Sequence, residues 1–378
     1  MIYLYRTFII LGLFFISCSS DSGTGSDKDK TNPVNDILVD SLATTETVAL
    51  YKNLEAIDDS GVLFGHQDDL AYGVGWMAET GRSDVKEVCG DYPAVYGWDL
   101  GDIQNEYNLD GVNFDMMRLW IKEVYNRGSI NTISMHLDNP VTGGDAWDNT
   151  KAVDQILPGK VFHSSYMQTL ELITDFLASL KTNDDVLIPI IFRPYHEHNH
   201  SWPWWGSSSC SVAEYNALWK MTVEYLRDTR GLHNLIYAIS PQDITSAEQY
   251  LERYPGDDYV DVLGTDNYLL YNTSGISRLA TSLDIIGQLA ASKNKICALT
   301  EVGYENIPIA NWWTQYLLKA ITTSSYSKKA MWALVWRNAS ASHHFAPYPG
   351  DTSANDFIGF YNSSFTYFES DLPDLYHE

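Results

Sequence analysis

The sequence repeats one pattern eight times: a short apolar run ends in polar or aromatic residues, and an amphipathic stretch follows. The apolar runs are 61–67, 92–99, 130–140, 186–197, 234–243, 259–268, 295–303 and 330–338. Between them, residues 165–181 and 213–229 carry apolar side chains at steps of three and four, which is the helical period. Eight strands that alternate with helices predict an α/β protein with a single (β/α)8 TIM barrel.

The main alternative is an open, doubly wound sheet. The runs are apolar throughout rather than alternating, which is typical of a parallel sheet covered on both faces and fits either fold. A doubly wound sheet would carry a glycine-rich phosphate loop after an early strand, and no G-x-G-x-x-G is found there. No segment with the composition of a linker separates the runs, so one domain is expected.

In a barrel of this kind, functional side chains lie at the carboxyl ends of the strands, on one rim. Each predicted strand ends in groups that bind or react, where chance would leave several plain turns. These groups are His66 and Gln67, Trp98 and Asp99, His136, Arg193 with His196 and Glu197, Gln242 and Asp243, Asp266 and Tyr268, Glu301, and Trp336 and Arg337. The sequence therefore predicts a functional site at this rim.

Two glutamates stand out among these groups. Glu197 follows the fourth strand and Glu301 the seventh, and a barrel brings these strands across one mouth. Cleavage of a glycosidic bond needs a protonated carboxyl group for the leaving oxygen and an ionised one to attack or stabilise the anomeric carbon. Either glutamate alone can equally be a salt-bridge partner or hold a loop. The pair, with aromatic residues adjoining, favours a carbohydrate-cleaving enzyme.

Three histidines alternate after the fourth strand: His196, His198 and His200. On a strand they would point to one face and could bind a metal ion, with His136 as a fourth ligand. Pro194 and the later Pro203 interrupt the strand, so we expect structural or hydrogen-bonding roles and no metal site. The sequence also has no G-x-S-x-G elbow and no cysteine beside a histidine in a recognisable motif, which disfavours serine or cysteine nucleophiles.

Tryptophans supply the other component of a sugar site, because a flat ring covers the C–H face of a sugar and leaves the hydroxyl groups free. The candidates for this contact are Trp147, Trp202, Trp204, Trp205 and Trp336. Trp219, Trp312 and Trp332 fall inside helix or strand patterns and are expected to pack in the core.

The amino terminus has the features of a lipoprotein signal. Arg6 precedes the apolar run FIILGLFFI, which is too short for a transmembrane helix. FISC resembles a bacterial lipoprotein box, so residues 1–17 are predicted to be a signal peptide and Cys18 to be lipidated. The run SSDSGTGSDKDKTNPVND is polar, and residues 18–44 are predicted to form a flexible tether. A net charge of −25 disfavours nucleic acid as a partner.

Two segments together resemble glycoside hydrolase family 26, whose best-known members are β-mannanases: RPYHEHNHSWPWWG (193–206) and ALTEVG (298–303). Related barrel glycosidases carry asparagine before the acid/base glutamate, whereas this family carries histidine, as His196 precedes Glu197 here. The likeness extends over about residues 45–370. It implies a (β/α)8 catalytic domain over 45–378, a retaining double-displacement mechanism and no cofactor.

The resemblance also implies roles for single residues. Glu197 would be the acid/base and Glu301 the nucleophile, with Tyr268 hydrogen-bonded to the nucleophile. The substrate-binding positions would be His136, Arg193, His196, Trp202, Tyr268 and Trp336. As retaining enzymes require, the carboxyl groups of Glu197 and Glu301 are predicted to lie about 5–5.5 Å apart.

The activity that the resemblance implies is endo-acting hydrolysis of β-1,4-mannan, glucomannan or galactomannan. A mannobiose-releasing exo-enzyme of the same family is an alternative, and lichenases and xylanases also occur in it. A non-catalytic glycan-binding lipoprotein is an alternative from another class. The signal and the sequence style resemble Bacteroidetes glycan-utilisation enzymes, which implies an outer-membrane lipoprotein facing either the periplasm or the surface. We expect a monomer.

Overall fold

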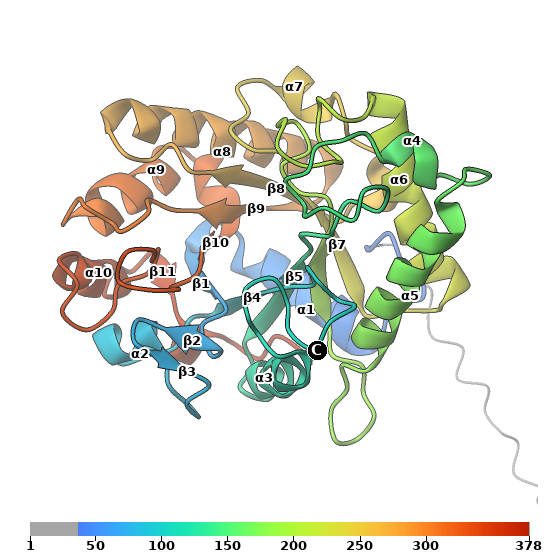
Figure 1. The fold of residues 1–378 in the computed structure, drawn as a ribbon. Coiled ribbons are helices and arrows are strands. Elements are labelled where there is room, and N and C mark those ends of the chain that lie inside the picture. The colour runs from blue at the N-terminus through green and yellow to red at the C-terminus, as the bar shows by residue number, and fades with distance from the viewer. Residues whose placement is uncertain (1–36, 378) are drawn as a thin grey trace, which may run out of the picture. The chain divides into compact units, whose positions relative to one another are not determined.

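The computed structural model describes residues 37–377. Eight parallel strands form a closed barrel, because each pairs with its neighbours in chain order and the last pairs with the first (Figure 1). They are β1 (Val62–Gln67), β4 (Val95–Asp99), β5 (Ile130–Ser134), β6 (Ile190–Arg193), β7 (Leu235–Ile239), β8 (Val262–Asn267), β9 (Ile296–Val302) and β10 (Ala330–Val335). The predicted (β/α)8 fold is confirmed, and each predicted run contains one barrel strand.

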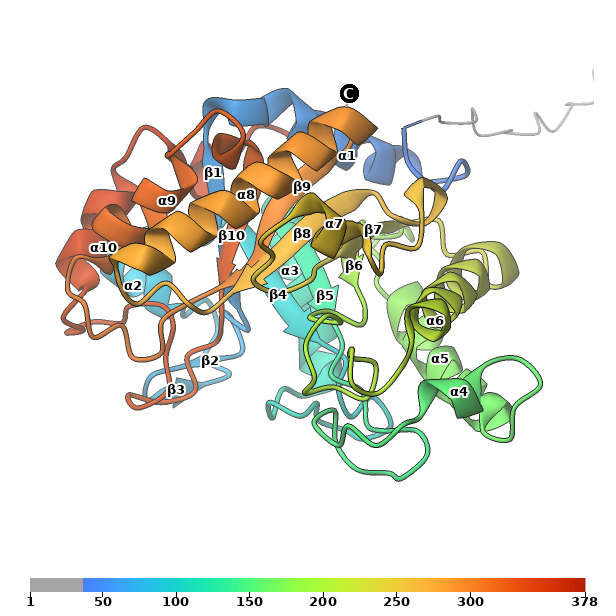
Figure 2. The same cartoon turned by 90° about the horizontal axis from the view of Figure 1, so that it is seen from above.

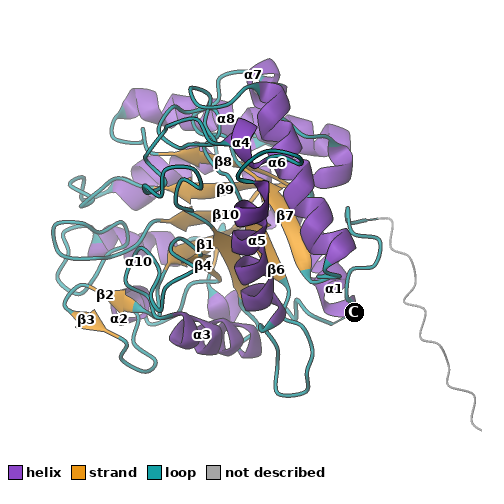
Figure 3. Cartoon of the chain, turned by 45° about the vertical axis from the view of Figure 1, so that its right-hand side comes forward, coloured by secondary structure: helices purple, strands orange, loops and turns teal. Residues whose placement is uncertain are grey.

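Helices surround the strands (Figure 3). They are α1 (Thr45–Ile57), α2 (Asp84–Cys89), α3 (Phe114–Asn126), α4 (Val153–Ile156), α5 (His163–Ala178), α6 (Val212–Glu224), α7 (Ala247–Leu251), α8 (Thr273–Lys293), α9 (Lys319–Ile321) and α10 (Ala354–Tyr361). Short π-helical segments, Tyr225–Thr229 and Trp313–Leu318, adjoin α6 and α9. The two predicted helical stretches correspond to α5 and to α6 with its π-helical segment.

Local sequence explains where helices begin and end. Helix α6 starts at a capping box, in which Ser211 accepts a hydrogen bond from the Glu214 backbone and the Glu214 carboxylate accepts one from the Ser211 backbone. Helix α8 starts after Asn272, which caps Gly275 N–H at 2.9 Å, and it ends at Asn294 in the left-handed conformation. This helix packs across β8 and β9 (Figure 2).

Three short strands lie outside the barrel. β2 (Tyr72–Gly73) and β3 (Trp76–Met77) form an antiparallel hairpin in the loop after β1. β11 (Thr366–Tyr367) pairs with β1 near the end of the chain.

Neighbouring residues of a strand point to opposite sides, and most of them therefore enter separate cores. Leu63 belongs to an inner core that includes Leu50 and Tyr51 of α1, whereas Phe64 packs outward against Trp313 and residues of α10. Helix α1 therefore closes the amino-terminal end of the barrel, and the site can form only at the carboxyl-terminal end. The predicted packing roles of Trp219, Trp312 and Trp332 are confirmed, since all three are fully buried.

Residues 37–44 pack on the amino-terminal end of the barrel. Leu38 and Ala43 are buried, the Val39 N–H donates to Asp261 at 2.8 Å, and Asp40 contacts His233 at 2.8 Å. The folded domain therefore begins before residue 45, and the predicted tether is too long at this end because its last residues supply apolar side chains and backbone hydrogen bonds. The rest of the tether, the signal peptide and Cys18 lie outside the described residues.

The barrel strands are shorter than the apolar runs that predicted them, and β5 and β6 show how the runs continue past the strand ends. β5 ends at Ser134 and β6 at Arg193, where the runs extend to residues 140 and 197. After β6, Tyr195 and Glu197 adopt positive φ angles of 48° and 50°, which an extended strand cannot contain. Among residues 37–377, no helix is long and apolar enough to cross a membrane.

Candidate active site

Glu197 lies on the loop that follows β6, at the carboxyl-terminal rim. Its backbone has a positive φ, and its N–H donates to the Ser240 carbonyl at 2.8 Å. This hydrogen bond joins the loop to the end of β7. The Trp202 indole N–H donates to the Glu197 Oε2 at 2.6 Å. The residue is only 7% exposed, so its carboxyl group is held in one position and largely removed from water.

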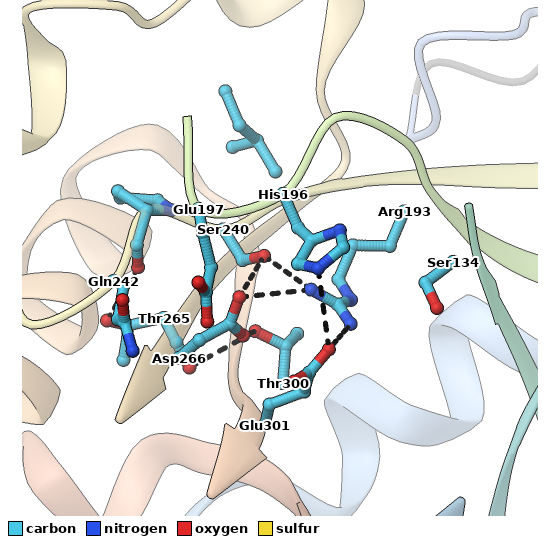
Figure 4. Close-up of polar contacts among 12 residues, drawn as sticks. Ser134, Arg193, His196, Glu197, Ser240, Gln242, Thr265, Asp266, Thr300 and Glu301 are labelled. Carbon is cyan, nitrogen blue, oxygen red and sulfur yellow. Dashed lines mark hydrogen bonds and ion pairs between the residues drawn. The ribbon is translucent and has the colours of Figure 1, made fainter. Parts of the chain in front are cut away.

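Glu301 lies near the end of β9 and is held by a different set of groups (Figure 4). The Tyr268 hydroxyl donates to its Oε2 at 2.7 Å, and the Arg193 guanidinium donates to its Oε1. The His196 Nε2 lies 3.9 Å from the same Oε1. A guanidinium and a hydroxyl group therefore hold this carboxylate in one position by hydrogen bonds to both of its oxygens.

Arg193 joins Glu301 to a second carboxylate. Its other terminal nitrogen donates to Asp266 at 3.0 Å and to the Ser240 hydroxyl at 2.9 Å (Figure 4). Asp266 also accepts hydrogen bonds from Ser240 at 3.0 Å and from Thr300 at 2.6 Å. The guanidinium is thereby fixed on both sides, because Glu301 accepts from one terminal nitrogen and Asp266 and Ser240 accept from the other.

Only part of this network could be predicted from the sequence. Asp266 was expected at the rim without a role, and Ser240 and Thr300 were not expected there. Ser240 directly follows β7, and Thr300 directly precedes Glu301 on β9. A signal was available for Asp266, since a carboxylate inside a fully buried strand must find a partner and Arg193 was already expected nearby.

Charge balance separates the two glutamates. Three buried carboxyl groups, Glu197, Asp266 and Glu301, surround one guanidinium, Arg193. Burial raises the pKa of Glu197 to about 8, with further contributions from the charges of Asp266 and Glu301. Burial also raises the pKa of Asp266 to about 7, although Arg193 opposes the change. Glu197 is therefore protonated at neutral pH, and it lies beside a carboxylate that accepts from Arg193 and Tyr268.

An aromatic wall stands beside Glu197. The His136 ring stacks on Trp147, with centroids 5.5 Å apart, and on Trp202, with centroids 5.7 Å apart. Trp336 meets His136 edge-on at 5.8 Å. Trp202 and Trp336 are partly exposed and Trp147 is 53% exposed, so their surfaces remain open to a ligand. The structure thus brings together the predicted site residues His136, Arg193, His196, Glu197, Trp202, Tyr268, Glu301 and Trp336.

Two of the five predicted sugar-stacking tryptophans belong to the core. Trp204 and Trp205 are fully buried, and their indole N–H groups donate to the backbone carbonyls of Leu137 and His196. They hold the loop after β6 in place and present no open face. Cys210 also packs here, with its thiol 3.2 Å from the Trp205 carbonyl.

The histidines have separate environments. Burial lowers the pKa of His196 far below its usual range, so that this ring is neutral beside Arg193. His198 stacks on Tyr215 and bonds its hydroxyl at 3.0 Å, away from the site. Burial by itself lowers the pKa of His136. The Asp99 carboxylate, 2.8 Å from the His136 Nδ1, has the larger effect in the opposite direction, so the pKa of His136 is raised. In residues 37–377, no group of three or more His, Cys, Asp and Glu side chains is placed to hold a metal ion.

The family model described as "Glycosyl hydrolase family 26" matches residues 39–311. The chain belongs to glycosyl hydrolase family 26. The predicted family is thus confirmed, and with it the class of enzyme, a glycoside hydrolase. The match begins within residues 37–44, which agrees with the packing of that segment on the barrel.

Solved structures and curated relatives of this family are similar over most of the chain. A family 26 β-mannanase structure from Bacteroides ovatus is 45% identical, covers 89% of this chain and 98% of its own, and has a TM-score of 0.85. A mannan endo-1,4-β-mannosidase from Bacillus subtilis is 29% identical over 89% of this chain and 92% of its own length. One from Bifidobacterium adolescentis is 36% identical over 74% of this chain, but the match spans 29% of that longer protein.

Proposed function

We propose that this family 26 glycoside hydrolase is an endo-acting, retaining β-1,4-mannanase for mannan, glucomannan or galactomannan. The observation that carries the proposal is the unequal setting of two buried carboxyl groups on one rim. Glu197 has a raised pKa of about 8 and a single indole donor, whereas Glu301 accepts from Arg193 and Tyr268. Relatives named as mannan endo-1,4-β-mannosidases support mannan as the substrate.

In the first step, a carboxylate oxygen of Glu301 attacks the anomeric carbon of the bound mannosyl unit. A bond forms between this oxygen and the carbon as the bond to the leaving oxygen breaks. Glu197 transfers its proton to that oxygen, so the leaving chain departs as an alcohol. Hydrogen bonds from Tyr268 and Arg193 keep the carboxylate of Glu301 oriented until the attack.

In the second step, the now ionised Glu197 takes a proton from water, whose oxygen attacks the anomeric carbon and releases Glu301. Two inversions give a β product from a β substrate. The change of role has an electrostatic cause: the ester neutralises Glu301, whose charge helps to raise the pKa of Glu197. The pKa of Glu197 therefore falls in the intermediate, and the residue can act as the base.

The raised pKa of Glu197 predicts the alkaline limit of activity. Because the acid must be protonated, kcat/KM should fall as the pH rises through about 8. Trp202→Phe removes an N–H that stabilises the ionised form, so this limb should move to higher pH. The measurement is kcat/KM against pH on a soluble manno-oligosaccharide. Trp147→Phe is the matched control, since Glu197 accepts nothing from Trp147, and a limb that moves equally in both variants would contradict the assignment.

The product profile over time tests the activity itself. An endo-enzyme should release mixed oligosaccharides early and cause a fast fall in mannan viscosity. Mannobiose alone from the start would instead indicate the exo-acting alternative. Binding of mannan without any new reducing ends would indicate the non-catalytic glycan-binding alternative, which needs the tryptophans but neither glutamate. Equal or greater activity on lichenan or xylan would overturn the choice of substrate.

A lipid anchor on Cys18 would place the enzyme at the outer membrane. The signal-like residues 1–17 and the FISC sequence support this localisation. Residues 37–44 pack on the end of the barrel opposite the active-site rim, so the chain enters the folded domain away from the cleft. Cys18→Ala should move the protein from the membrane fraction to the soluble fraction. A wild-type protein that is already soluble would refute the anchor.

A further inference from the structure

The loop of residues 139–150, which follows β5, is built around one buried side chain. Asn139 is fully buried, and its amide group donates to the Asp148 carbonyl at 2.9 Å and to the Thr150 carbonyl at 2.8 Å. The same amide oxygen accepts from the backbone N–H groups of Val141 at 3.0 Å and Thr142 at 3.2 Å. Every hydrogen-bonding position of this amide is therefore used within one loop.

The TGGD stretch at 142–145 makes the loop compact. Gly143 has a positive φ of 74°, which favours glycine, and a Cβ atom on Gly144 would lie 2.5 Å from the Asp148 carboxylate. The Asp145 carboxylate accepts from the Trp147 backbone N–H at 3.0 Å. Trp147 therefore lies on a loop that hydrogen bonds hold closed on both sides of it.

Core packing does not explain why the loop holds Trp147 in place, because its side chain is 53% exposed. Its ring lies 5.5 Å from Trp202, the residue whose N–H donates to Glu197. Its own indole N–H has no hydrogen-bond partner within residues 37–377, so this group is available to a sugar hydroxyl. A hydrogen bond also joins the two loops that carry these tryptophans, since the Asn149 side chain donates to the Ser201 carbonyl at 3.1 Å.

We infer that Asn139 is a positioning residue that sets Trp147 as the outer part of the subsite for the leaving-group sugar. The position of Trp202 indicates on which side of the scissile bond this subsite lies. Trp202 donates to the carboxyl group that protonates the leaving oxygen, and Trp147 extends the aromatic surface of Trp202. Asn139 touches no substrate and acts only through the loop. This inference rests on the proposed function, because it uses Glu197 as the acid and a β-mannan chain as the substrate.

The test separates the two sides of the scissile bond. Asn139→Ala should raise KM for mannohexaose roughly 10-fold with little change in kcat, the size expected when one aromatic contact is lost. Transfer of the glycosyl group to mannotriose as acceptor should weaken by a similar factor. Release of dinitrophenol from an aryl β-mannobioside, whose leaving group has no sugar, should change less than twofold.

A double-mutant cycle shows whether Asn139 acts through Trp147. Trp147→Ala should give the same pattern, and Asn139→Ala should add nothing when Trp147 is already alanine.

Asn234→Ala is the matched control for lost stability: Asn234 is another fully buried asparagine, bonded to the Ile188 carbonyl at 2.7 Å near the amino-terminal end of β7. It should lower the melting temperature without raising KM for mannohexaose. Should Asn139→Ala fail to fold, the exposed Asn149→Ala provides the same test with a smaller increase in KM.

Each result supports or overturns the inference. If the effects of Asn139→Ala and Trp147→Ala on KM for mannohexaose were additive, Asn139 would not act through the Trp147 ring. An equal loss on the aryl substrate would place the effect at the reaction centre, and an unchanged KM for mannohexaose would remove the role altogether. If the wild type cleaved no mannan, the proposed function would fail; if it did and the variants lacked this pattern, only the inference would fail.

Discussion

Replacing Glu301 by alanine should abolish cleavage of polysaccharide and of activated aryl mannosides alike, with kcat falling roughly 10⁴- to 10⁶-fold. The reason is that no other group supplies the attacking oxygen, whatever the leaving group. Azide can enter the space that the side chain leaves and displace the leaving group directly. The product of this single inversion is an α-glycosyl azide, which NMR identifies.

The control for this variant is Glu305→Ala, on the loop that directly follows β9. Glu305 has a side chain that is 53% exposed and pairs with His343, so its removal should change activity less than twofold. If Glu301→Ala retained cleavage of the aryl substrate, or gave the β-azide, Glu301 would not be the nucleophile.

A second large effect is expected from Glu197→Ala, and it should depend on the leaving group. On mannan, where the leaving alkoxide needs a proton, the loss should reach about 10²- to 10⁴-fold, the size of general acid catalysis. A dinitrophenyl mannoside needs no proton, so its glycosyl-enzyme should form nearly as fast as in the wild type. Breakdown then slows because the base is missing, and a burst of phenolate followed by slow turnover should be seen.

Azide should restore turnover in Glu197→Ala, because it needs no base to attack the intermediate. The product should be the β-glycosyl azide, since two inversions have occurred. Loss of the activated substrate as complete as in Glu301→Ala would show that the two roles are wrongly assigned. Swapped stereochemistry of the two azide products would show the same.

The barrel could be predicted because its signal is distributed over the whole chain. Each buried parallel strand needs an apolar run, and eight runs with helical patterns between them leave few other folds. The ends of the runs were less predictable. Leu137, for example, is buried although β5 ends at Ser134. The sequence therefore stays apolar beyond the last residue that pairs in the sheet.

The site could be predicted in part because the barrel converts strand ends into neighbours. This reasoning brought Glu197, Glu301 and Arg193 together from three separate segments, and the resemblance named their roles. It could not reveal Ser240 or Thr300, because a serine or threonine at the end of a strand is common and carries no charge that demands a partner. It also missed Asn139, whose function is visible only once the loop is seen to close around it.

Composition could not separate the tryptophans that face the cleft from those that support it. Trp202, Trp204 and Trp205 are almost adjacent in the sequence, yet only Trp202 keeps an open surface. The difference arises from loop geometry: the loop buries Trp204 and Trp205, whose N–H groups then bond backbone carbonyls, as buried indoles need a partner. The indole N–H of Trp202 bonds a carboxyl group of the site instead.

Covalent trapping tests the paired roles of Glu197 and Glu301 most directly. A 2-deoxy-2-fluoro-β-mannosyl fluoride forms the glycosyl-enzyme and slows its hydrolysis, because the fluorine at C2 destabilises the positively charged transition state. Digestion of the labelled protein and mass spectrometry then locate the sugar. We predict one equivalent of label, attached to Glu301 within the segment ALTEVG (298–303). Label on Glu197 or Asp266, or hydrolysis with inversion and no label, would contradict the retaining mechanism as assigned.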